Sequence, residues 1–377
     1  MHRDEFHVPG PGPYVLAHSV GCLPTRAAAA IQQHYLKPWQ LQGGDAWPAW
    51  LSSVDEFRKS LAALFGGDAA AYCPQANLSS GLAKLLPALP RRPGRTVLLA
   101  AEDSFPSMAF VLQQAREIGY ETRLIPRAQD PSSFGTWSGA LTPEVAAALV
   151  THVHSNTGVV APVADIAALC RERDIYSVVD VAQSAGILPV SVVDFAADVL
   201  LGSCVKWLCG GPGAGFMWIR PSLLSRLAPA DVGWFSHDDP FEFDVHSFRY
   251  ADDARRFWGG TPSVAPYVVA TVGLRTIADI GVDQIRAHNR ELMQVFRGEL
   301  PARWRDRVDA GRIGGTVCIP LGDARDEILG SLRANSVRAD SRGSVVRLSF
   351  HIYNTGAEAA YVARSWAGVK VPRPGGP

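Results

Sequence analysis

The strongest constraint on the fold is an alternation of short β-branched segments and helical segments through the middle of the chain. Alternation of this kind is typical of α/β crossover units built around a mainly parallel sheet. The strand candidates are apolar throughout, as strands covered on both faces are. The expected strands are residues 96–103, 147–156, 176–183, 197–204 and 213–220, and the expected helices between them are residues 107–119 and 163–174. The sequence therefore predicts an α/β domain.

The pattern changes after residue 264, where two long helical segments cover residues 266–300. A strand, a helix and a second strand follow, which together favour a smaller α+β unit. We expect the Gly/Pro-rich N-terminal segment to pack back near this unit. The predicted division is an N-terminal segment (1–24), a large domain (25–264), a small C-terminal domain (265–370) and a flexible tail (371–377).

The composition gives no reason to expect a polyanionic partner. Lys+Arg and Asp+Glu both number 36, so the formal charge is zero and neither nucleic acid nor an anionic membrane is favoured. No apolar run reaches the length of a membrane span, and the N-terminus lacks the basic-then-apolar pattern of a signal peptide. We expect a cytoplasmic protein that binds a small neutral or zwitterionic ligand.

Neither a disulfide framework nor a metal site is expected. The six cysteines are scattered and include no C-x-x-C pair, so they are predicted to be free thiols. His152 and His154 would share one face of a strand, but no third ligand stands at the spacing of a metal site.

One segment, Val178 to Arg220, carries the candidate chemistry. Asp180 ends an apolar strand, and Lys206 follows a later strand and precedes the glycine-rich turn "CGGPGAG". Ligands of open α/β sheets collect at the carboxyl ends of the strands, where both residues are expected. Taken alone, Asp180 could cap a helix or turn and Lys206 could be a solvated lysine. Together they supply what pyridoxal 5′-phosphate needs, an amine that forms a Schiff base with its aldehyde and a carboxylate that pairs with its ring nitrogen.

Nucleotide cofactors lack their phosphate loops in this sequence. There is no G-x-G-x-x-G opening a first βα unit and no G-x-x-x-x-G-K-[ST] motif. The glycine cluster "GGPGAG" follows Lys206 instead of preceding it.

Longer stretches of the chain resemble the class V aminotransferase superfamily of fold-type I pyridoxal phosphate enzymes. The resemblance rests on "HVHSNTGVVAPVADIAALCRERD", on the region from Val179 to Ile219 and on "VRLSFHIYNTGAEA". The stretches "YVLAHSVGCLP", "DSFPS", "VGWFSH" and "RADSR" resemble the kynureninase-like branch in particular. The resemblance implies a large domain with a mainly parallel seven-stranded sheet, a small C-terminal α+β domain, and a homodimer with its active sites at the subunit interface.

The resemblance also assigns cofactor-binding roles. Lys206 would form the Schiff base, Asp180 would pair with the pyridine nitrogen, and Phe105 would stack on the cofactor ring. Gln183 and Asn156 would lie beside the phenolic oxygen. The phosphate would be bound by Gln75 and Ala76 at a helix start, by Ser203 and Trp234, and by Thr261 of the neighbouring subunit.

For the substrate, the resemblance implies that Arg347 holds the α-carboxylate through two parallel hydrogen bonds. His18 and Ser19 would line the substrate pocket.

Several positions depart from the kynureninase pattern. Val205 stands where kynureninases carry a tyrosine that takes part in proton transfer. Gln183, Met108 and Thr261 replace a histidine, an aspartate and an asparagine. Because hydrolytic carbon–carbon cleavage needs proton donors that a valine cannot supply, Val205 argues against kynureninase activity. The segment "VRADSRGSV" also lacks the nucleophilic cysteine of cysteine desulfurases.

The expected activity is that of a pyridoxal phosphate enzyme that removes the Cα proton of an amino acid with Lys206 as the base. Transamination is the leading hypothesis, because it needs only Lys206, the cofactor and a carboxylate clamp. Kynureninase-like Cβ–Cγ hydrolysis and β-elimination remain alternatives, as does a pyridoxal phosphate-binding protein with a degenerate site.

Overall fold

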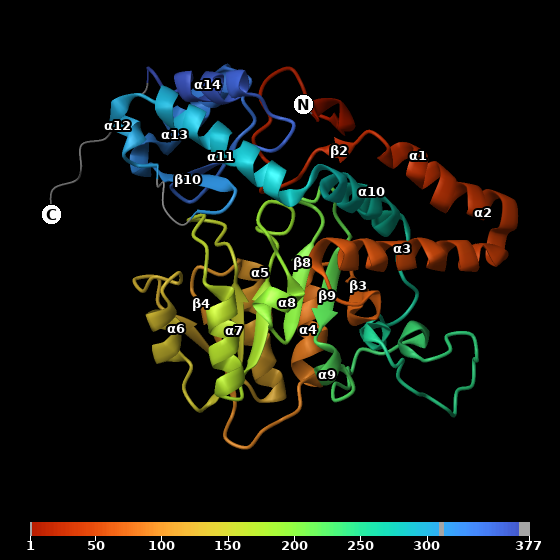
Figure 1. The fold of residues 1–377 in the computed structure, drawn as a ribbon. Helices are drawn as coiled ribbons and strands as arrows, with labels where there is room; N and C mark the ends of the chain where they lie inside the picture. The colour runs from red at the N-terminus through yellow and green to blue at the C-terminus, as the bar shows by residue number, and fades with distance from the viewer. Residues whose placement is uncertain (1, 309–312, 369–377) are drawn as a thin grey trace.

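The computed structural model describes residues 2–308 and 313–368, and its larger unit is built on a seven-stranded sheet (Figure 1). β9 runs antiparallel to both of its neighbours, whereas every other pair is parallel. In spatial order the strands are β3 (Tyr72–Gln75), β9 (Gly215–Ile219), β8 (Val199–Ser203), β7 (Tyr176–Asp180), β6 (Val145–Thr151), β4 (Val97–Ala101) and β5 (Glu121–Ile125). The predicted α/β fold with a mainly parallel seven-stranded sheet is confirmed.

Amphipathic helices cover this sheet. α7 (Val163–Glu172) buries Val163, Ile166 and Cys170 at three- and four-residue spacing, as its sequence pattern predicts. β4, β6 and β7 are buried at every position, so both faces of the sheet are covered. The other helices before residue 281 are α1 (Ala27–Ile31), α2 (Lys37–Gln42), α3 (Trp47–Phe65), α4 (Leu78–Ala88), α5 (Pro106–Gln114), α6 (Phe134–Ala140), α8 (Val192–Phe195), α9 (Pro221–Leu224) and α10 (Ala265–Ile280).

The C-terminal unit has a three-stranded antiparallel sheet with β12 in the centre. Its elements are α11 (Val282–Glu299), α12 (Ala302–Arg305), β10 (Thr316–Pro320), α13 (Arg325–Ala334), β11 (Asp340–Arg342), β12 (Val345–Ser349) and α14 (Gly356–Arg364). Val346 and Leu348 of β12 pack with Phe296 in a core separate from that of the large sheet. Leu274 and Ile277 of α10 are part of the core of the large unit. The domain boundary at 264/265 stays a prediction, and the expected tail 371–377 lies outside the described residues.

The N-terminal segment links the two units. Its first strands, β1 (Phe6–His7) and β2 (Leu23–Pro24), pair with each other. Val15 accepts a hydrogen bond from the backbone of Ser349 at 2.9 Å, and the N–H of Gly21 donates to the Val205 carbonyl at 2.8 Å. One short segment therefore contacts both the small sheet and the loop that carries Lys206.

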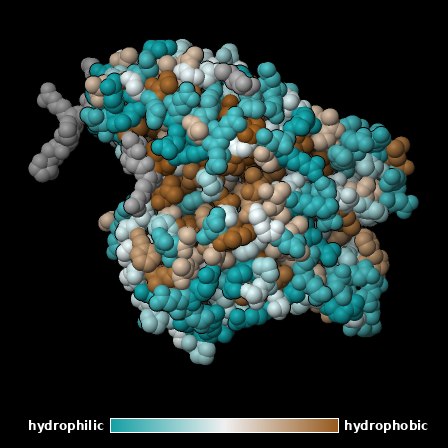
Figure 2. Space-filling model, viewed as in Figure 1, coloured by the Kyte–Doolittle hydropathy of each residue, from teal (hydrophilic) through white to brown (hydrophobic). Residues whose placement is uncertain are grey.

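Hydrophobic residues gather between the C-terminal unit and the large sheet on the face shown in Figure 2, and again at the right-hand edge over α2. Trp39 and Leu41 at this edge are 54% and 73% exposed. In the described part of the chain no single helix has both the length and the apolarity to span a membrane, although the bent pair α10 and α11, at 78°, has them in combination.

Candidate active site

The carboxyl ends of the parallel strands bring most of the predicted site residues to one edge of the large sheet. Asp180, the last residue of β7, pairs with Thr151 of β6 and Leu201 of β8. Two residues further along β8, Ser203 pairs with Gly215, which in turn pairs with Gln75 of β3. The register of four adjacent strands therefore places Asp180, Ser203 and Gln75 along the same edge.

Asp180 is a buried carboxylate with few partners. Its Oδ1 accepts a hydrogen bond from the N–H of Ala182 at 2.8 Å, and only 4% of the residue is exposed. No cationic group among the described residues lies within ion-pair distance of it. Burial raises the pKa of Asp180, whereas the Ala182 hydrogen bond and the charge of Lys206 oppose that rise. The site therefore holds an acceptor that a protonated ring nitrogen would satisfy.

Lys206 lies in a loop whose backbone is packed from two sides. A Cβ at Gly21 would overlap the Lys206 carbonyl, and a Cβ at Gly273 in α10 would overlap the carbonyl of Leu208. Beyond the lysine, Gly211 and Gly213 have φ of 71° and 89°, which glycine adopts without steric penalty. The glycines around Lys206 thus let the N-terminal segment and α10 approach its backbone closely.

The surroundings of Lys206 favour the neutral form of its amine, which can act as a base. Its Nζ lies 5.6 Å from the centroid of the Phe105 ring. Lys206 keeps partial exposure, yet burial of the amine lowers its pKa to about 8; Asp180 opposes this shift, and the charges of Arg342 and Arg347 add to it. The predicted partners Lys206, Asp180 and Phe105 therefore share one environment.

The predicted phosphate turn lies where α4 begins. Gln75 is buried, and its Nε2 donates to the Phe257 carbonyl at 3.3 Å. Ala76 is exposed and precedes Asn77, the N-cap residue of α4, whose Oδ1 accepts from the N–H of Ser80 at 2.9 Å. An exposed backbone at a helix N-terminus favours an anion. Ser203 lies on the same sheet edge, where its Oγ accepts from the Val205 N–H at 3.4 Å.

Asn156 and Gln183 have hydrogen-bonding capacity that no other described residue uses. Asn156 Oδ1 and Gln183 Oε1 are buried without a hydrogen-bond partner. Gln183 Nε2 donates to the carbonyl of His18 at 3.0 Å. Two buried amide oxygens without partners, a buried carboxylate and an amine of lowered pKa fit a ring with polar substituents, so the described residues fit pyridoxal phosphate.

Trp234 and Thr261 contact each other. Trp234 Nε1 donates to Thr261 Oγ1 at 3.3 Å, and the indole packs edge-on against Trp47. Among the described residues, neither side chain forms a hydrogen bond or ring contact with Lys206 or Asp180. The assignment of Trp234 to the cofactor phosphate, and of Thr261 to the phosphate bound by a neighbouring subunit, stays a prediction.

Arg347 faces the large unit from β12. Alternation along this strand turns Val346 and Leu348 into the small core and leaves Arg347 and Ser349 on the opposite face. The fork of Arg347 is held by Asp340, its cross-strand neighbour, with Nε donating to Oδ1 at 2.9 Å and Nη2 donating to Oδ2 at 2.5 Å. Arg347 Nη1 donates to the Ser155 carbonyl at 3.3 Å.

His18 joins this ion pair through Asp340. The Nε2 of His18 lies 2.9 Å from Asp340 Oδ1, and its Nδ1 lies 2.8 Å from Ser349 Oγ. Burial lowers the pKa of His18, and the carboxylate of Asp340 opposes that shift. Ser19, the other predicted pocket residue, is partly exposed next to it. The structure therefore brings His18 and Arg347 together through an aspartate that sequence reasoning did not single out.

Arg342 is a second guanidinium at this place. Its Nη1 donates to Ser155 Oγ at 2.7 Å, and its Cζ lies 4.9 Å from the centroid of the Phe105 ring. Asp340 and Arg342 are two residues apart on β11 and so share the face that Arg347 occupies on β12. The signal for both lies in "RADSR", where period-two alternation puts the acid and the arginine on one face.

The two histidines after β6 do not belong to a three-ligand cluster among the described residues. β6 ends at Thr151, so His152 and His154 lie in the following loop, and the expectation that they share a strand was wrong. His152 packs edge-on against Phe195 at 4.9 Å, and burial lowers its pKa to about 4.

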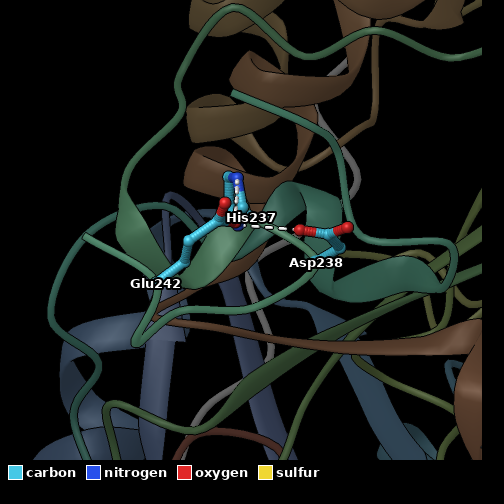
Figure 3. Close-up of side chains that lie close together, drawn as sticks. All are labelled: His237, Asp238 and Glu242. Carbon is cyan, nitrogen blue, oxygen red and sulfur yellow. Dashed lines mark ion pairs between the residues drawn. The ribbon is translucent and has the colours of Figure 1, made fainter. Parts of the chain in front are cut away.

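Figure 3 shows a different cluster, His237, Asp238 and Glu242, with ligand atoms within 4.8 Å of one another. Arg249 binds both carboxylates, through Nε to Asp238 Oδ2 at 2.9 Å and through Nη2 to Glu242 Oε2 at 2.5 Å. His237 Nε2 is bonded to the Ser247 carbonyl at 2.8 Å. Arg249 therefore supplies a positive charge to the two carboxylates of this cluster. These contacts connect residues within one loop.

Known proteins share this fold and these motifs. The profile of the family "Aminotransferase class-V" matches residues 85–362. A kynureninase of Deinococcus radiodurans is 32% identical over 305 residues, covering 78% of this chain and 72% of that protein. The uncharacterized aminotransferase YcbU of Bacillus subtilis is 26% identical over 347 residues, which is 90% of each chain.

Solved structures support the fold. A variant of C-DES with glycine covalently linked to its pyridoxal phosphate cofactor has a TM-score of 0.86 at 22% identity, covering 98% of this chain and 99% of that one. A cysteine desulfurase of Thermococcus onnurineus has a TM-score of 0.81 at 20% identity, covering 95% and 94%. The chain belongs to the class V aminotransferase family of pyridoxal phosphate-dependent enzymes, in its kynureninase-like branch.

Proposed function

We propose that this chain holds pyridoxal 5′-phosphate at Lys206 and transforms an amino acid by removal of its Cα proton, and that the reaction is a transamination. The observation that carries the proposal is an amine with a pKa of about 8 close to a buried carboxylate that lacks a cationic partner among the described residues. When bound, the cofactor supplies an electron sink for the negative charge that develops at Cα.

The residues of the chain divide the remaining work. Lys206 accepts the Cα proton, and a pKa near 8 leaves part of the amine neutral at physiological pH. Asp180 stabilises a protonated ring nitrogen, because a buried carboxylate interacts strongly with a nearby cation. The backbone of Ala76 and the hydroxyl of Ser203 are assigned to the phosphate, and the amides of Asn156 and Gln183 are assigned to the phenolic oxygen.

Arg347 is assigned to the substrate α-carboxylate. Asp340 engages its Nε and one proton of Nη2, and the Ser155 carbonyl accepts from Nη1. One proton on each terminal nitrogen is then free for an incoming carboxylate. Asp340 also fixes the plane of the guanidinium, which reduces the entropy lost when the substrate binds.

Kynureninase-like hydrolysis is the second candidate, because the Deinococcus radiodurans relative is a kynureninase. Its chemistry needs a proton donor near the cleaved bond. Both ring nitrogens of His18 are bonded, to Asp340 and to Ser349, and Val205 has no titratable group. Because both nitrogens of His18 are engaged and Val205 cannot donate a proton, transamination is favoured over hydrolysis.

The proposed assembly is a homodimer in which Thr261 of one subunit reaches the phosphate bound by the other. The loop that follows Trp234 exposes apolar side chains, with Phe243 at 72% and Val245 at 90% exposure. Burial of this loop against a second copy would remove apolar surface from water. The cytoplasmic location and the absence of a nucleic-acid partner remain predictions.

The test is a product analysis of the purified enzyme, loaded with pyridoxal phosphate and incubated with a panel of amino acids, with and without 2-oxo acids. Transamination consumes the added 2-oxo acid and releases a new amino acid together with the 2-oxo acid of the substrate. Release of ammonia with pyruvate would instead identify a β-eliminating lyase. Formation of alanine from kynurenine without a 2-oxo acid would identify the hydrolase and overturn transamination.

A further inference from the structure

The small sheet presents two guanidinium groups to the site, and among the described residues Asp340 is the one carboxylate that bonds to either of them. Asp340 binds Arg347 through both of its oxygens. Arg342 forms no ion pair with any described residue, and its Nη1 donates to the neutral hydroxyl of Ser155 at 2.7 Å. Within the described part of the chain, one positive charge on this face is therefore left without an ion-pair partner of its own.

The charge of Arg342 lies near Lys206, the residue assigned to the reaction. The centroid of the Phe105 ring lies 4.9 Å from Arg342 Cζ and 5.6 Å from Lys206 Nζ, so both cations contact the same ring. Ser155, which the two arginines share, belongs to the loop after β6. Burial lowers the pKa of Arg342 and the charge of Arg347 adds to the shift, while the charge of Asp340 opposes it, so a further anion at this place would relieve an unfavourable interaction.

The cofactor phosphate is a poor match for this charge. The phosphate is assigned to Ala76 and Ser203, whereas Arg342 shares its partner Ser155 with Arg347, which is assigned to the substrate α-carboxylate. An anion for Arg342 must therefore come from the substrate. Arg347 is only 5% exposed, while Arg342 is partly exposed beside it.

We propose that Arg342 binds a second anionic group, carried by the side chain of the substrate, and that the substrate class of this enzyme is amino acids with an acidic side chain. The inference rests on the proposed function, because the amino acid must bind at Lys206. Arg347 binds the α-carboxylate, and Arg342 binds the side-chain carboxylate with charge-assisted hydrogen bonds.

The experiment compares isosteric pairs, aspartate with asparagine and glutamate with glutamine, which differ in side-chain charge at nearly constant shape. Wild-type kcat/KM should favour the acidic member of at least one pair by about 10- to 100-fold. Arg342→Gln should lose this preference, so that its kcat/KM for the acidic member falls to the value for the neutral member measured at the same pH. Arg342→Lys should keep part of the preference, because it keeps the charge but not the fork.

Arg325→Gln is the matched control, since Arg325 lies in the same unit and is paired with Asp326. It should leave the preference unchanged. Loss of the preference in Arg342→Gln with retained cofactor absorbance supports the inference. A wild-type enzyme that turns over the amides as well as the acids overturns the inference and leaves the proposed function standing. A protein that binds no pyridoxal phosphate overturns both.

Discussion

Asp340 and Arg347 face each other across β11 and β12 and form a bidentate ion pair, with Nε donating to Oδ1 at 2.9 Å and Nη2 donating to Oδ2 at 2.5 Å. The pair joins the predicted carboxylate-binding arginine to His18 in the N-terminal segment. The proposed substrate-binding end of the site is therefore held together by two parts of the chain that are far apart in sequence, the N-terminal segment and the pair β11 and β12.

Removal of the Asp340 carboxylate should lower the stability of the folded protein. Asp340→Asn leaves the buried Arg347 without its counter-charge, and we expect the free energy of unfolding at neutral pH to fall by about 2–4 kcal/mol. Urea unfolding of the two proteins measures the difference. Asp323→Asn, at an exposed position, is the control and should change stability by less than about 0.5 kcal/mol. Equal stability of Asp340→Asn and wild type would show that the ion pair contributes nothing.

The same pair predicts an acid dependence of stability. Burial raises the pKa of Asp340, but the hydrogen bond from His18 and the charge of Arg347 outweigh burial and hold the pKa at about 2, below its ordinary value of 3.8. A carboxylate with a lowered pKa stabilises the fold above its unfolded pKa and loses that effect as the pH falls. The stability gap between wild type and Asp340→Asn should therefore narrow from about pH 5 to pH 2, and a constant gap across that range would contradict the assignment.

Gly21→Ala should disturb the loop that carries Lys206, because Gly21 packs against the backbone of that loop. The added methyl group would overlap the carbonyl of Lys206, and the Gly21 N–H already bonds the Val205 carbonyl. We expect a loss of about 1–3 kcal/mol in stability together with weaker cofactor binding. Gly44→Ala, at an exposed glycine with no atom within 4 Å of the added Cβ, is the matched control. Unchanged thermal stability and cofactor affinity in Gly21→Ala would show that the N-terminal segment does not clamp the loop.

The amine of Lys206 should control the pH dependence of cofactor attachment. Burial lowers its pKa to about 8, and only the neutral amine attacks an aldehyde. The rate of attachment to cofactor-free protein should therefore rise with pH through a midpoint near 8. Arg342→Gln should move the midpoint upward, because the charge of Arg342 contributes to the lowered pKa of Lys206. Stopped-flow absorbance measures the profile, and a midpoint above about 10, typical of a solvated lysine, would contradict the burial effect.

Asp180→Asn should keep the cofactor but lose most turnover. Its carboxylate matters most when negative charge develops in the transition state, so we expect kcat to fall by about 10²- to 10³-fold. Asp198→Asn is a useful contrast, since Asp198 is also buried but binds Arg220 and the backbone of Ser177. It should lower stability and spare the turnover of the folded protein. Wild-type kcat in Asp180→Asn would make Asp180 structural.

The sequence predicted the sheet because its strands are apolar runs separated by amphipathic helices such as α7, and both patterns are local. It also singled out Lys206 and Asp180, because an acid at one strand end and a lysine before a glycine-rich turn after a later strand together match the needs of one cofactor. The partner of Arg347 could not be predicted in the same way. The cross-strand pairing of Asp340 with Arg347 depends on the register of β11 and β12, which the residue pattern leaves open.

The contact between Gly21 and the loop that carries Lys206 could not be predicted from the sequence either. It joins segments about 185 residues apart and follows only from tertiary packing. The position of Arg342 over the Phe105 ring has the same cause, because β11 and the loop after β4 meet only when the two units fold together.

The most direct test of the central proposal is borohydride reduction of the protein loaded with pyridoxal phosphate, followed by peptide mapping. The label should be found on the peptide that contains Lys206, and Lys206→Ala should carry none. Lys84 and Lys37 provide internal comparisons, because Lys84 is held by the carbonyls of Phe257 and Trp258 and Lys37 begins α2. Labelling of Lys84 or Lys37 in the wild type, or an equal label in Lys206→Ala, would contradict the assignment of Lys206.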